Sequence, residues 1–375
     1  MEAFDVLIIG AGIAGASLAW RLASKRKVLL IEREAFPGMH STGRSAAMFM
    51  ESYGPPGVRA LTRASRSLYE QPPAGFCDTP LLARRGALYV AMHGQDALLA
   101  QTAHELTSHG GTVEQINAAD TLSRVPCLRP EFVIGSLFEA AAEDVDVHAL
   151  HQGFLRGFKC GSGVLRTDTQ VVAASRNHTG WDIRLNSGDA VRASVVVDAA
   201  GAWADEVAAQ FGVPRVGLVP RRRSAFTFRA PDGVDVSSWP TVVSVDEGWY
   251  FKPDAGRLLG SPANADDTVP HDVMPEEIDI AIGIDRLQTA TTLTIRRPER
   301  TWAGLRSFVS DGELVIGFDN HVPRFFWLAA QGGYGIQSAA GASELAAALL
   351  CGETLPDSLR AAGVDPAVCQ PSRLR

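Results

Sequence analysis

Three glycines near the N-terminus have the spacing of a loop that binds a dinucleotide. Gly10, Gly12 and Gly15 form the pattern GxGxxG. In this pattern the first glycine permits a tight turn, the second lets the backbone approach a pyrophosphate, and the third allows close helix packing. Ile13 and Ala14 lie between them and would contribute backbone N–H groups at the start of a helix, where phosphates are stabilised.

Apolar runs around this loop predict the elements that must position it. Residues 6–9 form one run, residues 13–23 suit a helix, and residues 28–31 form a second run. Such unalternating runs on both sides of a helix are typical of a parallel sheet buried on both faces. Glu32 ends the second run and is placed to accept hydrogen bonds from ribose hydroxyls. Arg33, beside it, is expected near the adenine or in solvent.

A second glycine-rich loop, at residues 331–335, precedes a helical pattern over residues 336–350. The N-terminal glycines alone do not distinguish NAD from FAD. FAD is long enough to need both loops, with its pyrophosphate on the first helix and its isoalloxazine near the second. We therefore favour FAD and keep an NAD-dependent dehydrogenase as an alternative.

The rest of the chain predicts a mixed architecture. A hairpin over residues 181–197 ends in small residues at 198–201, and alternating segments such as 292–295 and 307–316 predict antiparallel sheet between residues 221 and 317. The expected fold class is α/β, or α+β overall: a Rossmann-like FAD-binding domain interleaved with an antiparallel-sheet substrate domain. The FAD-binding domain is assigned to residues 1–80, 145–220 and 320–375, and the substrate-binding domain to 81–144 and 221–319.

Composition excludes several classes of protein. The chain has 375 residues, 46% of them hydrophobic and 21% charged, with a net charge of −7, so neither disorder nor a nucleic-acid partner is expected. Five cysteines without metal-ligand or redox-pair spacing favour reduced thiols in the cytoplasm. The N-terminus does not read as a signal peptide, no run approaches the ~20 residues of a transmembrane helix, and no metal site is predicted.

Longer blocks carry a family resemblance. They are residues 40–47, 73–77, 222–226, 260–266, 301–308 and 330–337. Together they resemble the D-amino-acid oxidase superfamily of FAD-dependent oxidoreductases, which includes glycine and sarcosine oxidases. Within it they look most like the bacterial D-arginine dehydrogenases, and the resemblance spans nearly the whole chain.

The resemblance implies a set of cofactor-binding residues. Ser41, Thr42, Ser45 and Ala46, with Ala47 ending the same block, would follow the pyrophosphate and flavin. Val171 would meet adenine through its backbone, and Gly201 and Trp203 would close over the cofactor. Gly333, Tyr334, Gly335, Ile336 and Gln337 would place backbone N–H groups near the flavin's pyrimidine carbonyl. Gly304 and Gly332 are also expected to contact the cofactor. Because none of the flavin-proximal blocks contains a cysteine, a noncovalent FAD is expected.

The resemblance also implies a substrate site. A planar guanidinium can bind a substrate carboxylate through two parallel charge-assisted bonds. Arg306 is the main candidate for this role, with Arg222, Tyr53 and Tyr250 assisting, and Gly333 is placed beside the substrate as well. Tyr53 lies in a turn-forming segment suited to a mobile lid.

Two departures from the D-arginine dehydrogenases bear on the substrate. Met48 stands where they have a histidine close to the substrate, and Ala87 stands where they have a glutamate that meets its guanidinium. A buried cation without a partner is strongly disfavoured, whereas an apolar side chain gains from burial. We therefore expect weak activity on D-arginine and a preference for neutral or apolar D-amino acids.

The expected reaction is hydride transfer from the substrate Cα to flavin N5, giving an imino acid that water converts to a 2-keto acid and ammonia. The reduced flavin then needs oxygen, a quinone or another acceptor, which the sequence leaves open. A glycine- or sarcosine-type amine oxidase and a 2-hydroxy-acid dehydrogenase remain alternatives on the same fold. A noncatalytic flavin-binding protein is the alternative of another class.

Overall fold

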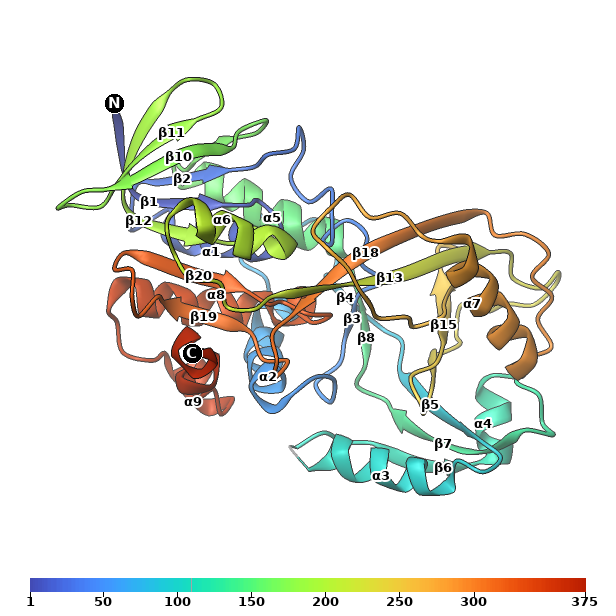
Figure 1. Ribbon diagram of the computed structural model, residues 1–375. Coiled ribbons are helices and arrows are strands. Elements are labelled where there is room, and N and C mark those ends of the chain that lie inside the picture. Colours follow the sequence, from blue (N-terminus) through green and yellow to red (C-terminus); the bar gives the residue numbers. More distant parts are fainter. Residues whose placement is uncertain (109) are drawn as a thin grey trace.

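A computed structural model describes residues 1–108 and 110–375 of the protein. Two larger β-sheets and a small one build it, and a pair of long strands runs from one large sheet to the other (Figure 1). Both chain termini lie at the end of the molecule that holds the first sheet (Figure 1).

The first sheet contains the predicted βαβ unit, which the structure confirms. Parallel strands β1, β2 and β12 form its centre, and their alternate residues enter two separate cores. This explains the unalternating apolar runs, because both faces of these strands are buried. The strands are β1 (Glu2–Ile9), β2 (Val28–Ile31), β9 (Val164–Arg166), β10 (Val171–Arg176), β11 (Trp181–Leu185), β12 (Ala190–Asp198), β19 (Val315–Phe318) and β20 (Phe325–Ala329).

Helices cover both faces of this sheet. One core packs the sheet against α1 (Ile13–Leu22), α2 (Pro56–Glu70), α5 (Val147–Cys160) and α8 (Gly335–Cys351), and the other packs it against α6 (Ala204–Gln210). The C-terminal segment adds α9 (Asp357–Ala361) and the 3₁₀ turns Pro366–Cys369 and Pro371–Leu374, and another such turn spans Gly201–Trp203.

The second sheet is largely antiparallel. One face packs on α7 (Glu277–Ala290) and α4 (Ala118–Arg124), and the other on α3 (Asp96–Thr107). Its strands are β5 (Ala87–Met92), β6 (Glu114–Asn117), β7 (Val133–Glu139), β13 (Val219–Phe228), β14 (Thr241–Ser244), β15 (Tyr250–Asp254), β16 (Arg257–Ser261), β17 (Asp266–Asp267) and β18 (Arg300–Phe308). A small third sheet joins β3 (Met48–Phe49), β4 (Leu82–Arg84) and β8 (Glu143–Val145).

Parts of the region predicted as antiparallel sheet differ in the structure. Residues 292–295 keep the alternating burial but form no strand, and only the flanking Thr291 makes an isolated bridge, to Leu128. Residues 307–316 contain the end of β18 and the start of β19, both of them antiparallel as predicted, but in different sheets: β18 pairs with β13, whereas β19 pairs with β20 in the first sheet. Helix α7 within this region was not predicted. The division into an FAD-binding and a substrate-binding domain is kept as a proposal.

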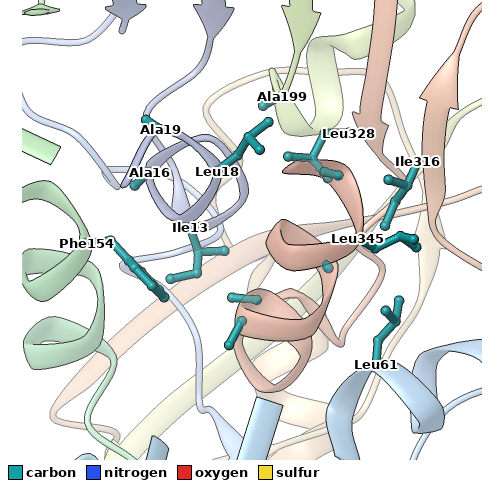
Figure 2. Close-up of a cluster of buried hydrophobic side chains, with 14 of the residues drawn as sticks. Ile13, Ala16, Leu18, Ala19, Leu61, Phe154, Ala199, Ile316, Leu328 and Leu345 are labelled. Carbon is teal, nitrogen blue, oxygen red and sulfur yellow. The ribbon is translucent and has the colours of Figure 1, made fainter. Parts of the chain in front are cut away.

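Helix α8 lies at the centre of the core that packs against the first sheet. Figure 2 shows Leu345 of α8 among side chains of α1, α2, β19 and β20. A Cβ added at Gly341 would overlap the Leu61 carbonyl oxygen, so α2 and α8 approach closely there. Alanine- and leucine-rich sequence favours the helix, and Gly352 ends it in the left-handed conformation at φ +66°. In the residues that the structure describes, no helix has the length and hydropathy to cross a membrane.

We predict that Leu345→Ala lowers the free energy of unfolding by about 2–5 kcal/mol, because Leu345 is fully buried and its removal leaves a cavity. Leu349→Ala, on the same helix but partly exposed, is the matched control and should cost ~1 kcal/mol. Urea unfolding followed by circular dichroism measures both. Equal losses for the two variants would contradict this account of the core.

Candidate active site

Three cavities in the protein share wall residues and so form one continuous space. The first and second share Gly12, Ser41, Thr42, Ala199 and Gly201. The second and third share Ser45, Ala46, Arg223, Tyr250, Arg306 and Gly333. The space begins at the carboxyl ends of β1 and β2 and ends on the second sheet. In a parallel sheet this edge is where nucleotides bind.

The first cavity surrounds Glu32. One carboxylate oxygen of Glu32 accepts a hydrogen bond from the Ala11 N–H at 2.9 Å and the other accepts from the Glu34 N–H at 3.1 Å. Each oxygen keeps a second lone pair for a ligand hydroxyl. The guanidinium of Arg33 lies 4.0 Å from the ring centre of Trp203. The predicted residues that line this cavity are Gly10, Gly12, Glu32, Arg33, Ser41, Thr42, Val171, Gly201 and Trp203.

The glycine loop has the shape that its sequence predicts. Gly10 has φ +99°, and a Cβ there would lie 2.5 Å from the Ala199 carbonyl oxygen. A Cβ at Gly15 would overlap the Gly10 carbonyl, so Gly15 allows packing and does not line the cavity. Thr42 Oγ1 accepts a hydrogen bond from the Ile13 N–H at 3.0 Å, which holds the predicted cofactor loop against the helix.

Two helix N-termini open into the second cavity. Helix α1 contributes Gly12, Ile13 and Ala14, and α8 contributes Gly335 and Ile336. In neither helix does the N-cap residue itself bond the first turn through a side chain, and neither first turn has an acidic residue. In α1 the Ile13 N–H is already bonded to Thr42 Oγ1, which leaves the N–H groups that follow it for a ligand. The first N–H groups of a helix lack helical partners and its N-terminus is electropositive, so both ends suit anionic or electron-rich groups.

Several other predicted cofactor residues line this second cavity, and two of them, Ser41 and Thr42, also line the first. These other residues are Ser41, Thr42, Ser45, Ala46, Gly304, Gly332 and Gly333. Ala47 and Gln337 line the third cavity, together with Ser45, Ala46 and Gly333. Tyr334 does not line any of the three; its ring packs edge-on against Tyr53, with ring centres 5.1 Å apart.

Arg306 lies half-buried between the second and third cavities. Its Nη1 donates a hydrogen bond to the Tyr53 hydroxyl at 3.4 Å. Burial alone would lower the pKa of Arg306, but Tyr53 and Tyr250 outweigh it, and the net direction is a raised pKa. A Cβ at Gly333 would lie 3.0 Å from Arg306 Nη1, so the backbone of the second glycine loop passes close to the guanidinium.

The second arginine of the cavity is Arg223, not Arg222 as predicted. In the β13–β18 ladder Arg222 lies opposite Leu305, whereas Arg223 lies opposite Gly304 and shares a face with Arg306. Side chains alternate along a strand, so adjacent arginines enter opposite faces. Arg222 is instead in ion pairs with Asp266, Glu276 and Asp279 and lines none of the three cavities.

Arg223 carries its charge in an environment that opposes it. Its Nε donates to the Asn264 carbonyl at 2.5 Å. Burial, with neighbouring Arg306 as the next cause, lowers the pKa of Arg223 to about 10. Among the described residues neither Arg223 nor Arg306 is in an ion pair. An anion bound between them would relieve the unfavourable burial of both charges.

One face of the second sheet forms the far wall of the third cavity. Strand register places Tyr250, Val243 and Tyr89 in one row, all of which line the cavity. The next row contains Lys252, Thr241, Ala87 and Glu139. Lys252 and Thr241 line the cavity.

Of the two predicted departures, Met48 lines the third cavity and Ala87 does not. Met48 Sδ lies 3.3 Å from Thr241 Oγ1, and Met50 joins it in the wall. Ala87 is fully buried beneath the wall, between Thr241 and Glu139 in adjacent strands. Its methyl group is too short to reach the space that a longer side chain could enter.

The segment before α2, predicted as a lid, is tied down in this structure. Gln337 Nε2 donates to the Tyr53 carbonyl at 3.2 Å, and Arg59 Nε donates to the Gly54 carbonyl at 2.6 Å. The Ser52 hydroxyl donates to the carboxyl group of Glu139, whose pKa is raised by burial. These contacts hold the Tyr53 hydroxyl against Arg306.

Sequence reasoning missed several wall residues of the third cavity. They are Met50, Tyr89, Arg223, Thr241, Val243, Glu247, Lys252 and Ala263. The spacing of Tyr250 and Lys252, two residues apart in one strand, could have indicated Lys252. Across the described residues no group of histidine, cysteine and acidic side chains is arranged to hold a metal ion.

Comparison with known proteins gives a family. The family model described as FAD dependent oxidoreductase (DAO) matches residues 5–349. FAD-dependent oxidoreductase domain-containing protein 1 of Mus musculus is 24% identical, with 93% of this chain and 81% of that protein covered. Glycine oxidase of Geobacillus kaustophilus is 23% identical, with 84% of each chain covered. For the mitochondrial dimethylglycine dehydrogenase of Rattus norvegicus, also 23% identical, 69% of this chain but only 30% of that protein is covered.

Solved structures agree on the fold. L-alpha-glycerophosphate oxidase of Mycoplasma pneumoniae with FAD bound superposes with a TM-score of 0.84 at 19% identity, covering 94% of this chain and 95% of that one. Glycine oxidase of Geobacillus kaustophilus gives 0.81 at 20% identity, covering 94% and 96%. At these identities the likeness concerns the fold.

We predict that Gly12→Ala weakens FAD binding by about tenfold or more, because the added Cβ would lie 3.2 Å from Thr42 Oγ1 where the backbone must approach the pyrophosphate. Gly12 has φ −68°, so alanine introduces no backbone strain. Fluorescence titration of the apoprotein with FAD measures the affinity, and the melting temperature of the apoprotein should be unchanged as the control. Wild-type FAD affinity in this variant would refute the assignment.

Proposed function

The chain belongs to the DAO family of FAD-dependent oxidoreductases, and we propose that it oxidises the Cα–N bond of small D-amino acids. The products would be an imino acid, then a 2-keto acid and ammonia after hydrolysis. Bound FAD supplies the acceptor, flavin N5, for the hydride that leaves Cα. The observation that carries the proposal is the half-buried pair Arg223 and Arg306, which lines both the second and the third cavity.

The residues of the connected cavities fit FAD. Glu32 and the wall around Val171 would hold the adenosine half, and the α1 N-terminus behind Gly12 would hold the pyrophosphate. The α8 N-terminus would lie at the flavin, where its dipole stabilises negative charge. None of the described residues that line these cavities is a cysteine, and we propose noncovalent binding.

The two guanidinium groups supply the binding energy and the orientation. A substrate carboxylate between Arg223 and Arg306 would receive charge-assisted hydrogen bonds from both, with the Tyr53 and Tyr250 hydroxyls beside it. Fixing the carboxylate fixes Cα, which lowers the entropy cost of aligning the Cα–H bond. No histidine lines this cavity among the described residues, so the amine is proposed to react in its neutral form without a strong general base.

The far wall supports a preference against cationic side chains. Met48, Met50 and Val243 present apolar surface, and Ala87 provides no carboxylate. Lys252 in the same wall adds a positive charge that opposes a guanidinium. Neutral D-amino acids are therefore proposed as better substrates than D-arginine. The D configuration is proposed from the resemblance of the sequence blocks to those of D-arginine dehydrogenases.

A second candidate is oxidation of a glycine-type or N-methylated amine, favoured by the similarity to glycine oxidase and dimethylglycine dehydrogenase. The carboxylate site would serve these substrates equally well. Product analysis separates an N-methylated amine, because sarcosine releases formaldehyde whereas a primary amino acid releases ammonia. Glycine also releases ammonia, so it is separated by comparing its rate of flavin reduction with the rates for larger D-amino acids.

We expect anaerobic mixing of the purified holoprotein with neutral D-amino acids to bleach the flavin absorbance near ~450 nm, since hydride transfer reduces the flavin. D-arginine should bleach it at least about tenfold more slowly at equal concentration, in keeping with the missing carboxylate at Ala87. L-amino acids, sarcosine and 2-hydroxy acids complete the panel. Absence of bleaching by every amino acid would overturn the proposal.

Arg223→Met and Arg222→Met form a matched pair of adjacent variants. Arg223→Met should weaken binding of pentanoate, an unreactive carboxylate, by about 30-fold or more, because one of the two half-buried charges is lost. Arg222→Met should leave pentanoate affinity within about threefold and instead lower the melting temperature, because Asp279 loses its ion-pair partner. Titration of the flavin spectrum measures the affinity. A larger loss of pentanoate affinity in Arg222→Met than in Arg223→Met would show that Arg222, and not Arg223, binds the carboxylate.

The pKa of Arg223, lowered to about 10 by burial and by Arg306, gives this binding a pH dependence. Below that pH the Arg223 guanidinium is charged and attracts the carboxylate. Above it Arg223 loses its charge, and the carboxylate is attracted by Arg306 alone, whose pKa is raised. Pentanoate affinity of the wild type should therefore fall as the pH rises through about 10. Arg223→Met should bind weakly at every pH without this fall.

A further inference from the structure

Lys252 is a buried charge in the far wall that the proposed reaction does not use. It follows Tyr250 by two residues on β15, so both side chains lie on the cavity face of the sheet. Two residues of a strand advance by about 7 Å, which places Lys252 one row beyond the tyrosine that flanks the carboxylate site. Only 8% of the Lys252 side chain is exposed to solvent.

The ammonium group of Lys252 is incompletely satisfied by the protein. Its Nζ donates to Asp144 Oδ1 at 2.7 Å. The Ala47 carbonyl at 3.5 Å and Met48 Sδ at 3.9 Å lie at the limit of hydrogen bonding. An ammonium has three donors, so a ligand in the cavity can accept from it.

The charges around Lys252 leave an excess of positive charge. Asp144 is shared with Arg85, whose Nε lies 2.7 Å from Oδ2, so the carboxylate neutralises only one of two cations. The cavity wall also contains Arg223 and Arg306. Glu247 is the acidic side chain among the described wall residues, and it is exposed to solvent. One substrate carboxylate therefore leaves the cavity cationic.

We propose that Lys252 determines specificity by binding an acid group at the end of the substrate side chain, so that D-aspartate or D-glutamate is preferred among the amino acids. This inference rests on the proposed function, D-amino-acid oxidation, and within it ranks acidic substrates above the neutral ones. The α-carboxylate would lie at Arg223 and Arg306 and the side-chain carboxylate at Lys252, where it would complete the donors of the ammonium. An apolar side chain of equal length would leave two of those donors with only the long contacts to the Ala47 carbonyl and Met48 Sδ.

Unreactive ligands test the site independently of turnover. Glutarate and pentanoate have the same chain length, but only glutarate has a second carboxylate. On the wild-type holoprotein glutarate should bind at least about tenfold more tightly, as measured by perturbation of the flavin spectrum, and Lys252→Met should abolish the difference. Equal affinity of the two ligands for the wild type would overturn the inference.

The structure supplies controls for this variant. Arg85 remains as a partner of Asp144 in Lys252→Met, which limits the effect on folding. Lys252→Arg keeps the charge and should keep most of the preference for glutarate. Lys25→Met removes an exposed lysine paired with Glu353 and should change neither affinity. A loss of discrimination in Lys252→Arg as large as in Lys252→Met would indicate a structural role instead.

Turnover provides the second readout. The ratio of kcat/KM for D-glutamate to that for D-methionine should fall at least about tenfold in Lys252→Met, chiefly through KM for D-glutamate. An equal fall for both substrates would overturn the inference. If no amino acid reduces the flavin while glutarate discrimination depends on Lys252, the proposed function fails and the assignment of Lys252 stands.

Discussion

The packing of α8 between α1 and α2 is the interaction on which the site depends. Helices α1 and α8 are separated by more than 300 residues, yet both N-termini open into one cavity. Small residues make this possible, since Gly341 lets α8 approach the α2 backbone and Ala16 and Ala19 of α1 lie in the same core (Figure 2). Close packing leaves little freedom to adjust, so the relative position of the two glycine loops is fixed by the core itself.

The second constraint is the uncompensated positive charge of the third cavity. A protein interior disfavours an unpaired charge. This cavity contains two guanidinium groups without an ion-pair partner, and Lys252, which shares the Asp144 carboxylate with Arg85. The long β13–β18 ladder, which extends from one large sheet to the other (Figure 1), holds both arginines on one face. Placing two positive charges close together is unfavourable, but the many backbone hydrogen bonds of the ladder stabilise the strands enough to keep both arginines in place. The site is thereby organised for an anion before one binds.

The substrate wall differs from the cofactor loops in how it is built. The cofactor loops use backbone N–H groups and glycines, which depend little on side-chain identity. The wall uses side chains from three neighbouring strands, so a substitution at one row position changes the shape and charge that a ligand meets. Ala87 illustrates this: its side chain is too small to reach the cavity, so Thr241 and Lys252 are the residues of that row that a ligand contacts.

Local pattern determined much of the fold and of the cofactor site. Apolar runs and glycine spacings within a few tens of residues were enough to predict the βαβ unit, the position of Glu32 and the helix after the second glycine loop. Which of two adjacent arginines faces the cavity could not be predicted, because a strand has two possible phases and only pairing with a distant strand selects one. The same reason explains why residues 292–295 have the pattern of a strand without a partner, and why β19 joins the first sheet. The sequence by itself therefore determined the cofactor-binding unit, whereas tertiary register decided Arg223, Lys252 and the burial of Ala87.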